Sequence, residues 1–372
     1  MNSRNHIYAL IGIAAFTIYV LACRPAFSPD GRRILIPSFD SESKRVAVLL
    51  YDRDTKKISR FFEAPSPGTD KAGNVASVTW TTDGKQVIAI WPQADDTIMV
   101  AVLPLGATAP TRLFSVPGKK EAAISLMLPP PIVGRHLFLG GETISRLDLE
   151  TGEIKTAAIE GEAIYLENHR NQIFYVSGKD KAGEVGKLDP EHLTRNPIFQ
   201  LKADNNAGGP FLAVTRDGSH IALVTGEEKA PCIAVYKGSE LIRTIAVGST
   251  NNPITLGNIF WSADEKTIYA AGFREHTNDS GGLQFELCEV PLGGSPMRET
   301  PLFQLSGSLN DSVACLLQIA LSPDGKTIAA SSALCEEEEH ALYLVDITSS
   351  KRKVTKIPIP GPPARKSKTQ KN

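Results

Sequence analysis

Five cysteines are the most reactive side chains in this chain of 372 residues. Cys315 and Cys335 lie ten residues on either side of Gly325, which belongs to a turn sequence, so their thiols can face each other across a hairpin. A disulfide between them would close a loop of about 20 residues. The alternative is that both are small buried apolar side chains. The seven histidines form no close ligand pair and no Cys-x-x-Cys occurs, so we expect neither a metal site nor a cofactor.

The first 23 residues have the order of an export signal. Arg4 lies in a short polar start, and an apolar stretch follows at 7–22. The tetrad Val-Leu-Ala-Cys at 20–23 resembles the lipobox of bacterial lipoproteins, which implies that Cys23 becomes the lipidated first residue of the mature chain. An uncleaved anchor of about 16 apolar residues is the alternative. We therefore expect an exported protein that is anchored to a membrane of the bacterial envelope, at the periplasmic face or the cell surface.

A turn phrase recurs along the rest of the chain and predicts an internal repeat. Ser or Thr opens the phrase and can hydrogen-bond forward, Pro presets φ, Asp follows, and Gly closes the turn where φ is positive. Each copy precedes a short apolar run typical of a β-strand. The residues that carry the phrase are Ser28, Pro29, Asp30, Gly31, Asp83, Gly84, Asp217, Gly218, Asp264, Ser322, Pro323, Asp324 and Gly325. After Asp264, Glu265 stands where Gly is expected.

This phrase resembles the WD40-like repeat of TolB-type β-propellers, in which such a turn joins the first two strands of a blade. The copies at 28–31 and 322–325 match fully and three others match in part. Turn residues at 133–135 and 168–171 mark two further units by spacing alone. TolB also has an N-terminal α/β domain, and we expect no such domain in this chain.

A second turn follows each first one, for example Leu149-Glu150-Thr151-Gly152, so each unit should hold four strands. We therefore predict an all-β fold, a seven-bladed β-propeller of four-stranded antiparallel blades, with six or eight blades as the alternatives. Its units of about 50 residues slightly exceed the ~40–45 of a WD40 blade. The expected divisions are a signal or anchor at 1–23, one propeller domain at 24–360 and a disordered basic tail at 361–372.

In a propeller, the connections between blades lie on the face opposite the repeated turns. Three of these connections should carry adjacent amide or acid side chains: Asn205 with Asn206, Asn251 with Asn252, and Asn310 with Asp311. Loops held by a rigid scaffold often form binding sites, so we predict that these six residues belong to a binding face. The alternative is that Asn, Asp and Gly simply suit turns.

The sequence favours binding over catalysis. No Gly-x-Ser-x-Gly occurs, although peptidases that carry such propellers need it in a separate hydrolase domain. Lys and Arg number 40 against 41 Asp and Glu, which gives no sign of a nucleic-acid partner. We expect a monomeric, non-catalytic scaffold that binds an envelope protein, a peptide or a glycan. A propeller hydrolase or lyase with a site in the central channel is the alternative.

Lipidation can be tested by metabolic labelling. We expect labelled palmitate to enter the wild-type protein and to be absent from Cys23→Ala, because a thiol at this position is the only acceptor that the lipobox provides. Equal labelling of the two proteins, or no labelling of either, would exclude lipidation and leave an uncleaved anchor.

Overall fold

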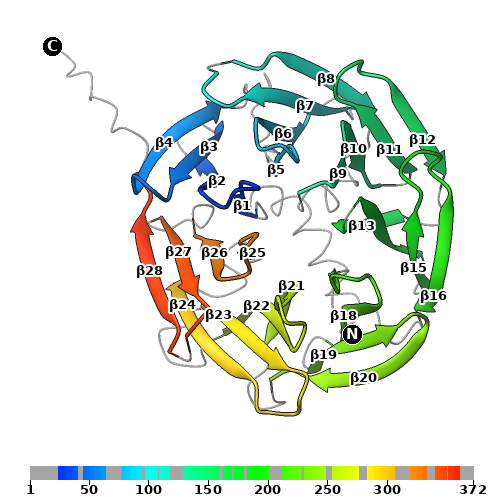
Figure 1. Ribbon diagram of the computed structural model, residues 1–372, viewed down its shortest axis with the longest axis vertical. Helices are drawn as coiled ribbons and strands as arrows, with labels where there is room; N and C mark the ends of the chain where they lie inside the picture. The colour runs from blue at the N-terminus through cyan, green and yellow to red at the C-terminus, as the bar shows by residue number, and fades with distance from the viewer. Residues whose placement is uncertain are drawn as a thin grey trace, which may run out of the picture.

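The computed structural model describes residues 24–40, 45–63, 77–93, 97–107, 109–117, 129–141, 143–158, 162–169, 171–179, 182–201, 211–227, 230–248, 254–275, 283–305, 319–332, 340–349 and 351–360. Within these ranges, seven antiparallel sheets of four consecutive strands follow one another along the chain. Figure 1 looks down the axis of the ring that they form. The prediction of a seven-bladed β-propeller is confirmed.

The blades are numbered in chain order, and the first strand of each is the innermost. Blades 1 to 4 consist of β1 (Ala26–Phe27), β2 (Arg33–Asp40), β3 (Arg45–Asp52), β4 (Lys57–Glu63); β5 (Ser77–Trp80), β6 (Gln86–Pro92), β7 (Thr97–Pro104), β8 (Arg112–Pro117); β9 (Ile132–Val133), β10 (His136–Leu139), β11 (Thr143–Asp148), β12 (Ile154–Ala158); and β13 (Glu162–His169), β14 (Gln172–Lys179), β15 (Ala182–Leu188), β16 (Arg195–Leu201). Blades 5 to 7 consist of β17 (Leu212–Val214), β18 (His220–Glu227), β19 (Ala230–Lys237), β20 (Glu240–Ala246); β21 (Thr255–Trp261), β22 (Thr267–Glu275), β23 (Leu283–Pro291), β24 (Arg298–Leu305); and β25 (Ile319–Leu321), β26 (Thr327–Ser331), β27 (Ala341–Asp346), β28 (Lys353–Pro358).

The hydrophobic core lies between the blades. One cluster joins Leu35 and Val48 of blade 1 to Val87 and Leu103 of blade 2. Five further clusters cover the other six contacts around the ring, because one of them spans blades 4, 5 and 6. Because both faces of the middle strands are covered, several of them are apolar without alternation, as in β6 and β7. Every blade therefore depends on its neighbours to bury its faces.

The outermost strands differ from the middle ones. The side chains of β20 and β28 are mostly exposed or half-buried. Register shifts between the third and fourth strands occur in blades 1, 4, 5 and 6, and Pro197 and Pro301 lie within the outer strands β16 and β24. Bulges and prolines blunt the open edges of a sheet. In the described part of the chain, no helix is long and apolar enough to cross a membrane.

The repeated phrase forms the turn between the first two strands, as predicted. In blades 1, 2, 5, 6 and 7 the opening hydroxyl donates to the Asp carboxylate at 2.5–2.9 Å and accepts the backbone N–H five residues onward at 2.9–3.0 Å. The closing glycines Gly31, Gly84, Gly218 and Gly325 all have φ between 68° and 76°. Glu265 has φ 57°, so it takes the left-handed conformation without the freedom of glycine.

These turns also touch one another around the ring. A Cβ added to Gly84 would lie 3.2 Å from Pro29 of blade 1, and one added to Gly325 would lie 2.9 Å from Ala263 of blade 6. Gly31 faces Pro323 of blade 7 in the same way, at 3.6 Å. In these three turns the closing position therefore lies against the second position of the turn in the preceding blade, whereas Gly218 lies near Gln172 and Phe174 of blade 4.

Blade 6 satisfies this geometry without glycine. A carboxylate oxygen of Glu265 accepts the backbone N–H of Arg216, which occupies the second position of the turn in blade 5. A proline at that position would have no N–H to donate. Two departures from the phrase, Arg216 for Pro and Glu265 for Gly, thus lie in contact with each other.

The contact between turns predicts different effects for two glycine substitutions. Gly325→Ala and Gly106→Ala should both be destabilised by about 1–2 kcal/mol, because both glycines have positive φ. No atom lies within 4 Å of a Cβ added at Gly106. We therefore expect Gly325→Ala to lose about 1 kcal/mol more through overpacking against Ala263. Urea unfolding of the two variants measures this difference in the free energy of unfolding. Equal destabilisation would show that the turn of blade 6 moves aside without a measurable cost.

Candidate functional site

The residues predicted to form the binding face all lie outside the described residues. Asn205 and Asn206 fall between β16 and β17, Asn251 and Asn252 between β20 and β21, and Asn310 and Asp311 between β24 and β25. The turns formed by the repeated phrase, which we call the motif turns, lie on one face of the ring. Because the strands of each blade alternate in direction, the described strand ends that flank these connections lie on the opposite face. We call this the connection face, and the opposite one the turn face.

The cysteines fall into two groups. Cys23, Cys315 and Cys335 lie outside the described residues, so their lipidation and disulfide remain predictions. Cys232 lies on β19 and Cys288 on β23, which are the third strands of blades 5 and 6. Cys288 is fully buried, and that burial raises the pKa of its thiol, so it is poorly suited to act as a nucleophile.

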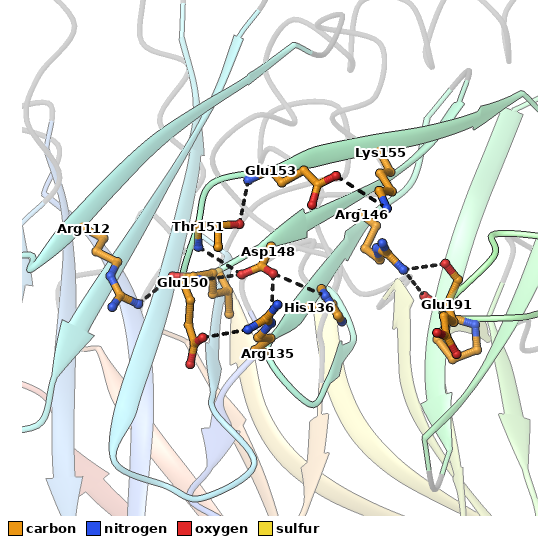
Figure 2. Close-up of polar contacts among 12 residues, drawn as sticks. Arg112, Arg135, His136, Arg146, Asp148, Glu150, Thr151, Glu153, Lys155 and Glu191 are labelled. Atoms are coloured by element: carbon orange, nitrogen blue, oxygen red, sulfur yellow. Dashed lines mark hydrogen bonds and ion pairs between the residues drawn. The ribbon is translucent and has the colours of Figure 1, made fainter.

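The densest set of polar contacts in Figure 2 surrounds Asp148, at the end of β11 on the turn face. One carboxylate oxygen of Asp148 accepts the backbone N–H groups of Glu150 and Thr151 at 2.8 and 3.0 Å. The other lies 2.9 Å from Nε of Arg135 and 3.6 Å from Nε2 of His136. The Asp148 side chain is only 5% exposed, so its charge is balanced by partners rather than by water.

The electrostatics of this cluster favour an ionised Asp148. Burial opposes ionisation, but the two backbone N–H groups and Arg135 lower the pKa of its carboxyl. Burial lowers the pKa of the neighbouring His136, and Arg146 and Arg135 add to that effect against the pull of Asp148. His136 is therefore mostly neutral at pH 7. The carboxylate beside it, Asp148, is already paired with Arg135 and with two backbone N–H groups.

The arrangement around Asp148 recurs in other blades. Asp52, Asp189 and Asp346 each cap the turn between the third and fourth strands by accepting backbone N–H groups two or three residues onward. Backbone N–H donors lower the pKa of each carboxyl, together with the hydroxyls of Thr55 and Thr348 at Asp52 and Asp346 and the ring of His192 at Asp189. Because the same bonds occur in four blades, the Asp148 cluster builds the turn face and does not define a reaction centre. Aligning the second turns with one another in the sequence would have revealed these aspartates.

Arginines connect the turn of one blade to that of the next. Arg112 of blade 2 donates to the carbonyl of Leu149 at 2.8 Å, and Arg146 of blade 3 donates to those of Pro190 and Glu191 at 3.0 and 2.6 Å (Figure 2). Arg352 of blade 7 pairs with Glu289 of blade 6, with 2.7 Å from Nε to Oε1. These contacts were not predicted, since nothing local in the sequence marks an arginine whose partner is a carbonyl of another blade.

One serine has a histidine and an aspartate as neighbours, which invites comparison with a catalytic triad. Ser219 Oγ lies 2.7 Å from His220 Nδ1 and 2.7 Å from Asp217 Oδ1. In a triad the histidine takes the serine proton and the aspartate holds the histidine. Here Asp217 contacts the serine itself and lies in the motif turn, so the serine proton points to a carboxylate that already caps the turn.

Metal chemistry also finds no support in the described ranges, where no group of three or more His, Cys, Asp and Glu side chains could hold an ion. The most buried carboxylates there form ion pairs. Glu286 lies 2.6 Å from Nε of Arg274, and Glu289 pairs with Arg352. The side chains of both pairs are largely buried. A buried charge needs a partner, so each arginine neutralises the carboxylate beside it.

No protein-family model matches the chain, and no curated protein matches it. Solved structures share its fold. A protein from Lactobacillus plantarum has a TM-score of 0.58 and 14% identity over 89% of this chain and 97% of its own. A protein from Bacteroides uniformis, provisionally named a 6-phosphogluconolactonase, has 0.55 and 15% over 88% and 96%. Hsv2 of Kluyveromyces lactis has 0.54 and 11% over 90% and 97%.

The chain is a seven-bladed β-propeller with WD40-like repeats. At these identities the comparisons establish the fold alone, because propellers carry many unrelated functions. Neither the TolB-type assignment nor the lipoprotein-like signal is tested by them.

The charge of Asp148 can be tested through its effect on stability. An aspartate whose folded pKa is depressed stabilises above its unfolded pKa of about 3.9, and this contribution is lost as the pH falls through the folded pKa. Asp148→Asn keeps a carbonyl that can cap the turn but loses the charge. We expect it to be about 1 kcal/mol less stable at pH 7, since hydrogen bonds to charged groups are stronger than neutral ones.

The difference should shrink as the pH falls below about 4, because Asp148 of the unfolded chain then takes up a proton while the folded carboxyl, whose pKa is lower, is still charged. Urea unfolding from pH 3 to pH 7 measures it. The control is Asp54→Asn, because Asp54 is 68% exposed and lies 3.8 Å from Arg32, so its charge should matter little at either pH. A difference for Asp148→Asn that does not change with pH would mean that its charge has no such role.

Proposed function

We propose that this protein is a non-catalytic binding scaffold of the bacterial cell envelope, and that its connection face recognises a protein, a peptide or a glycan. The observation that carries the proposal is the contrast between the two faces. On the turn face, the aspartates, hydroxyls and arginines of the turns are engaged with one another or with backbone groups. A face whose polar groups are already satisfied offers few of them to a ligand.

The connection face has the opposite character in the sequence. Three of its connections contain the pairs Asn205 with Asn206, Asn251 with Asn252, and Asn310 with Asp311. Amide side chains both donate and accept hydrogen bonds, so they suit the polar groups of a peptide or a glycan. A rigid propeller would present these connections at fixed spacing, which reduces the entropy lost on binding.

Export and anchoring belong to the same proposal. The resemblance of the first 23 residues to a lipoprotein signal supports a location at the envelope. Arg24, the first described residue, already lies 4.4 Å from the ring centroid of Phe260 in blade 6. No chain therefore remains for a long tether between Cys23 and the propeller, and a lipid on Cys23 would hold the propeller close to the membrane.

An enzymatic alternative has one observation in its favour, the shared fold with the Bacteroides uniformis protein provisionally named a 6-phosphogluconolactonase. At 15% identity that likeness concerns the fold only. Purified protein incubated with 6-phosphogluconolactone distinguishes the two ideas, because hydrolysis well above the spontaneous rate would replace the scaffold proposal.

The binding face can be tested by affinity capture of cross-linked partners from an envelope extract. The triple variant Asn205→Ala, Asn251→Ala and Asn310→Ala should lose the partner that the wild-type protein retains, because each change removes donors and acceptors. Its thermal stability should barely change, since surface substitutions usually fall within about 0.5 kcal/mol.

The matched control changes the turn face. Lys85, Lys237 and Lys266 are exposed there, and the triple variant of these residues to Ala should retain the partner. Loss of the partner in the lysine variant together with its retention in the asparagine variant would place the binding site on the turn face.

A further inference from the structure

The contact between blade 1 and blade 7, which we call the closure seam, differs from every other contact around the ring. Each of the seven described sheets contains four consecutive strands, so blades 1 and 7 exchange no strand with each other. Elsewhere, successive blades are joined covalently, as β4 is to β5 and β24 to β25. Figure 1 shows the first blade, in blue, beside the last, in red.

Apolar side chains fill the middle of the closure seam. Ile34, Ile36 and Tyr51 of blade 1 lie in one buried cluster with Ala329 and Leu342 of blade 7. Such contacts are not directional, and they are lost together when the two faces part. They stabilise the seam without fixing one blade covalently to the other.

At the turn face, where Gly31 also packs against Pro323, one side chain among the described residues makes a hydrogen bond across the seam. Arg53, in the turn between β3 and β4, donates to the carbonyl of Gly31 at 2.9 Å and to Oγ1 of Thr327 in β26 at 3.2 Å. Its guanidinium carbon lies 5.7 Å from the ring centroid of Phe27. Arg53 thus holds the first turn of blade 1 against the second strand of blade 7.

The neighbouring contact between blades 6 and 7 shows what the closure seam lacks. There Asn258 of blade 6 exchanges two hydrogen bonds with the backbone of Ile319, at 2.7 and 2.9 Å, and Phe303 stacks on Tyr343. Beyond these bonds, the chain itself runs from β24 to β25. Separating blades 6 and 7 would therefore leave them tethered, whereas blades 1 and 7 can part without a tether.

We propose that the propeller opens at the closure seam, and that the hydrogen bond from Arg53 to Thr327 sets how often it opens. Opening first breaks the side-chain contacts of the seam, and the backbone hydrogen bonds of the strands that it uncovers then open to water more often. It uncovers the apolar faces of β2, β3, β26 and β27. This inference does not depend on the proposed binding function.

Hydrogen exchange of the full-length protein, followed by mass spectrometry, tests the proposal. In Arg53→Ala we expect the amides of β2, β3, β26 and β27 to exchange about tenfold faster, because a lost hydrogen bond to a charged group changes the opening equilibrium by that order. Amides of blades 3 to 5 should keep their wild-type rates.

Three variants make the result specific. Thr327→Val removes the acceptor at nearly constant shape and should reproduce the faster exchange, whereas Thr327→Ser keeps the hydroxyl and should behave as wild type. Arg112→Ala removes a similar arginine contact between blades 2 and 3, which the chain also connects, and should affect only the turn around Leu149. The proposal fails if Arg53→Ala speeds exchange equally in all blades, or if Thr327→Val exchanges as slowly as Thr327→Ser.

Discussion

The close approach of successive motif turns is the constraint on which the inner ring depends. The closing residue of each described copy of the phrase has positive φ, and at Gly31, Gly84 and Gly325 the turn of the preceding blade lies against it. Glycine meets both conditions because it has no Cβ. This explains why the phrase recurs as Asp-Gly even where its earlier residues vary. It also explains Glu265, whose carboxylate reaches the N–H of Arg216 in the neighbouring turn and so replaces packing with a hydrogen bond.

Farther from the axis, the blades are joined by apolar faces and by arginines. Each blade covers the sheets beside it, and the core is distributed over the contacts between blades. Arg112, Arg146 and Arg352 then tie turns of one blade to groups of the next. A guanidinium suits this role because its fixed fork of donors can satisfy several acceptors at once. Only the contact between blades 1 and 7 joins the ends of the ring without a chain connection.

This construction bears on where function can reside. The turn face satisfies its own polar groups, including the Asp148 cluster, whose counterparts recur in blades 1, 4 and 7. A repeated bond pattern is a property of the architecture, while a functional site in a propeller is expected to break the repetition. The adjacent amide or acid side chains at Asn205, Asn251 and Asn310, in three of the connections between blades, break it in the sequence.

The sequence alone determined the architecture of this protein. Turn chemistry acts within four residues, so the phrases at Ser28 and Ser322 and the paired second turns were sufficient to predict seven blades of four strands. The tertiary structure decided which residues join the blades. Arg53 with Thr327 and Arg146 with Glu191 come from segments far apart in the chain or from elements without a shared motif, and their partners include backbone carbonyls that no sequence pattern marks. Likewise, the need for glycine at Gly325 arises partly from Ala263 of another blade, and that contact exists only once the ring has formed.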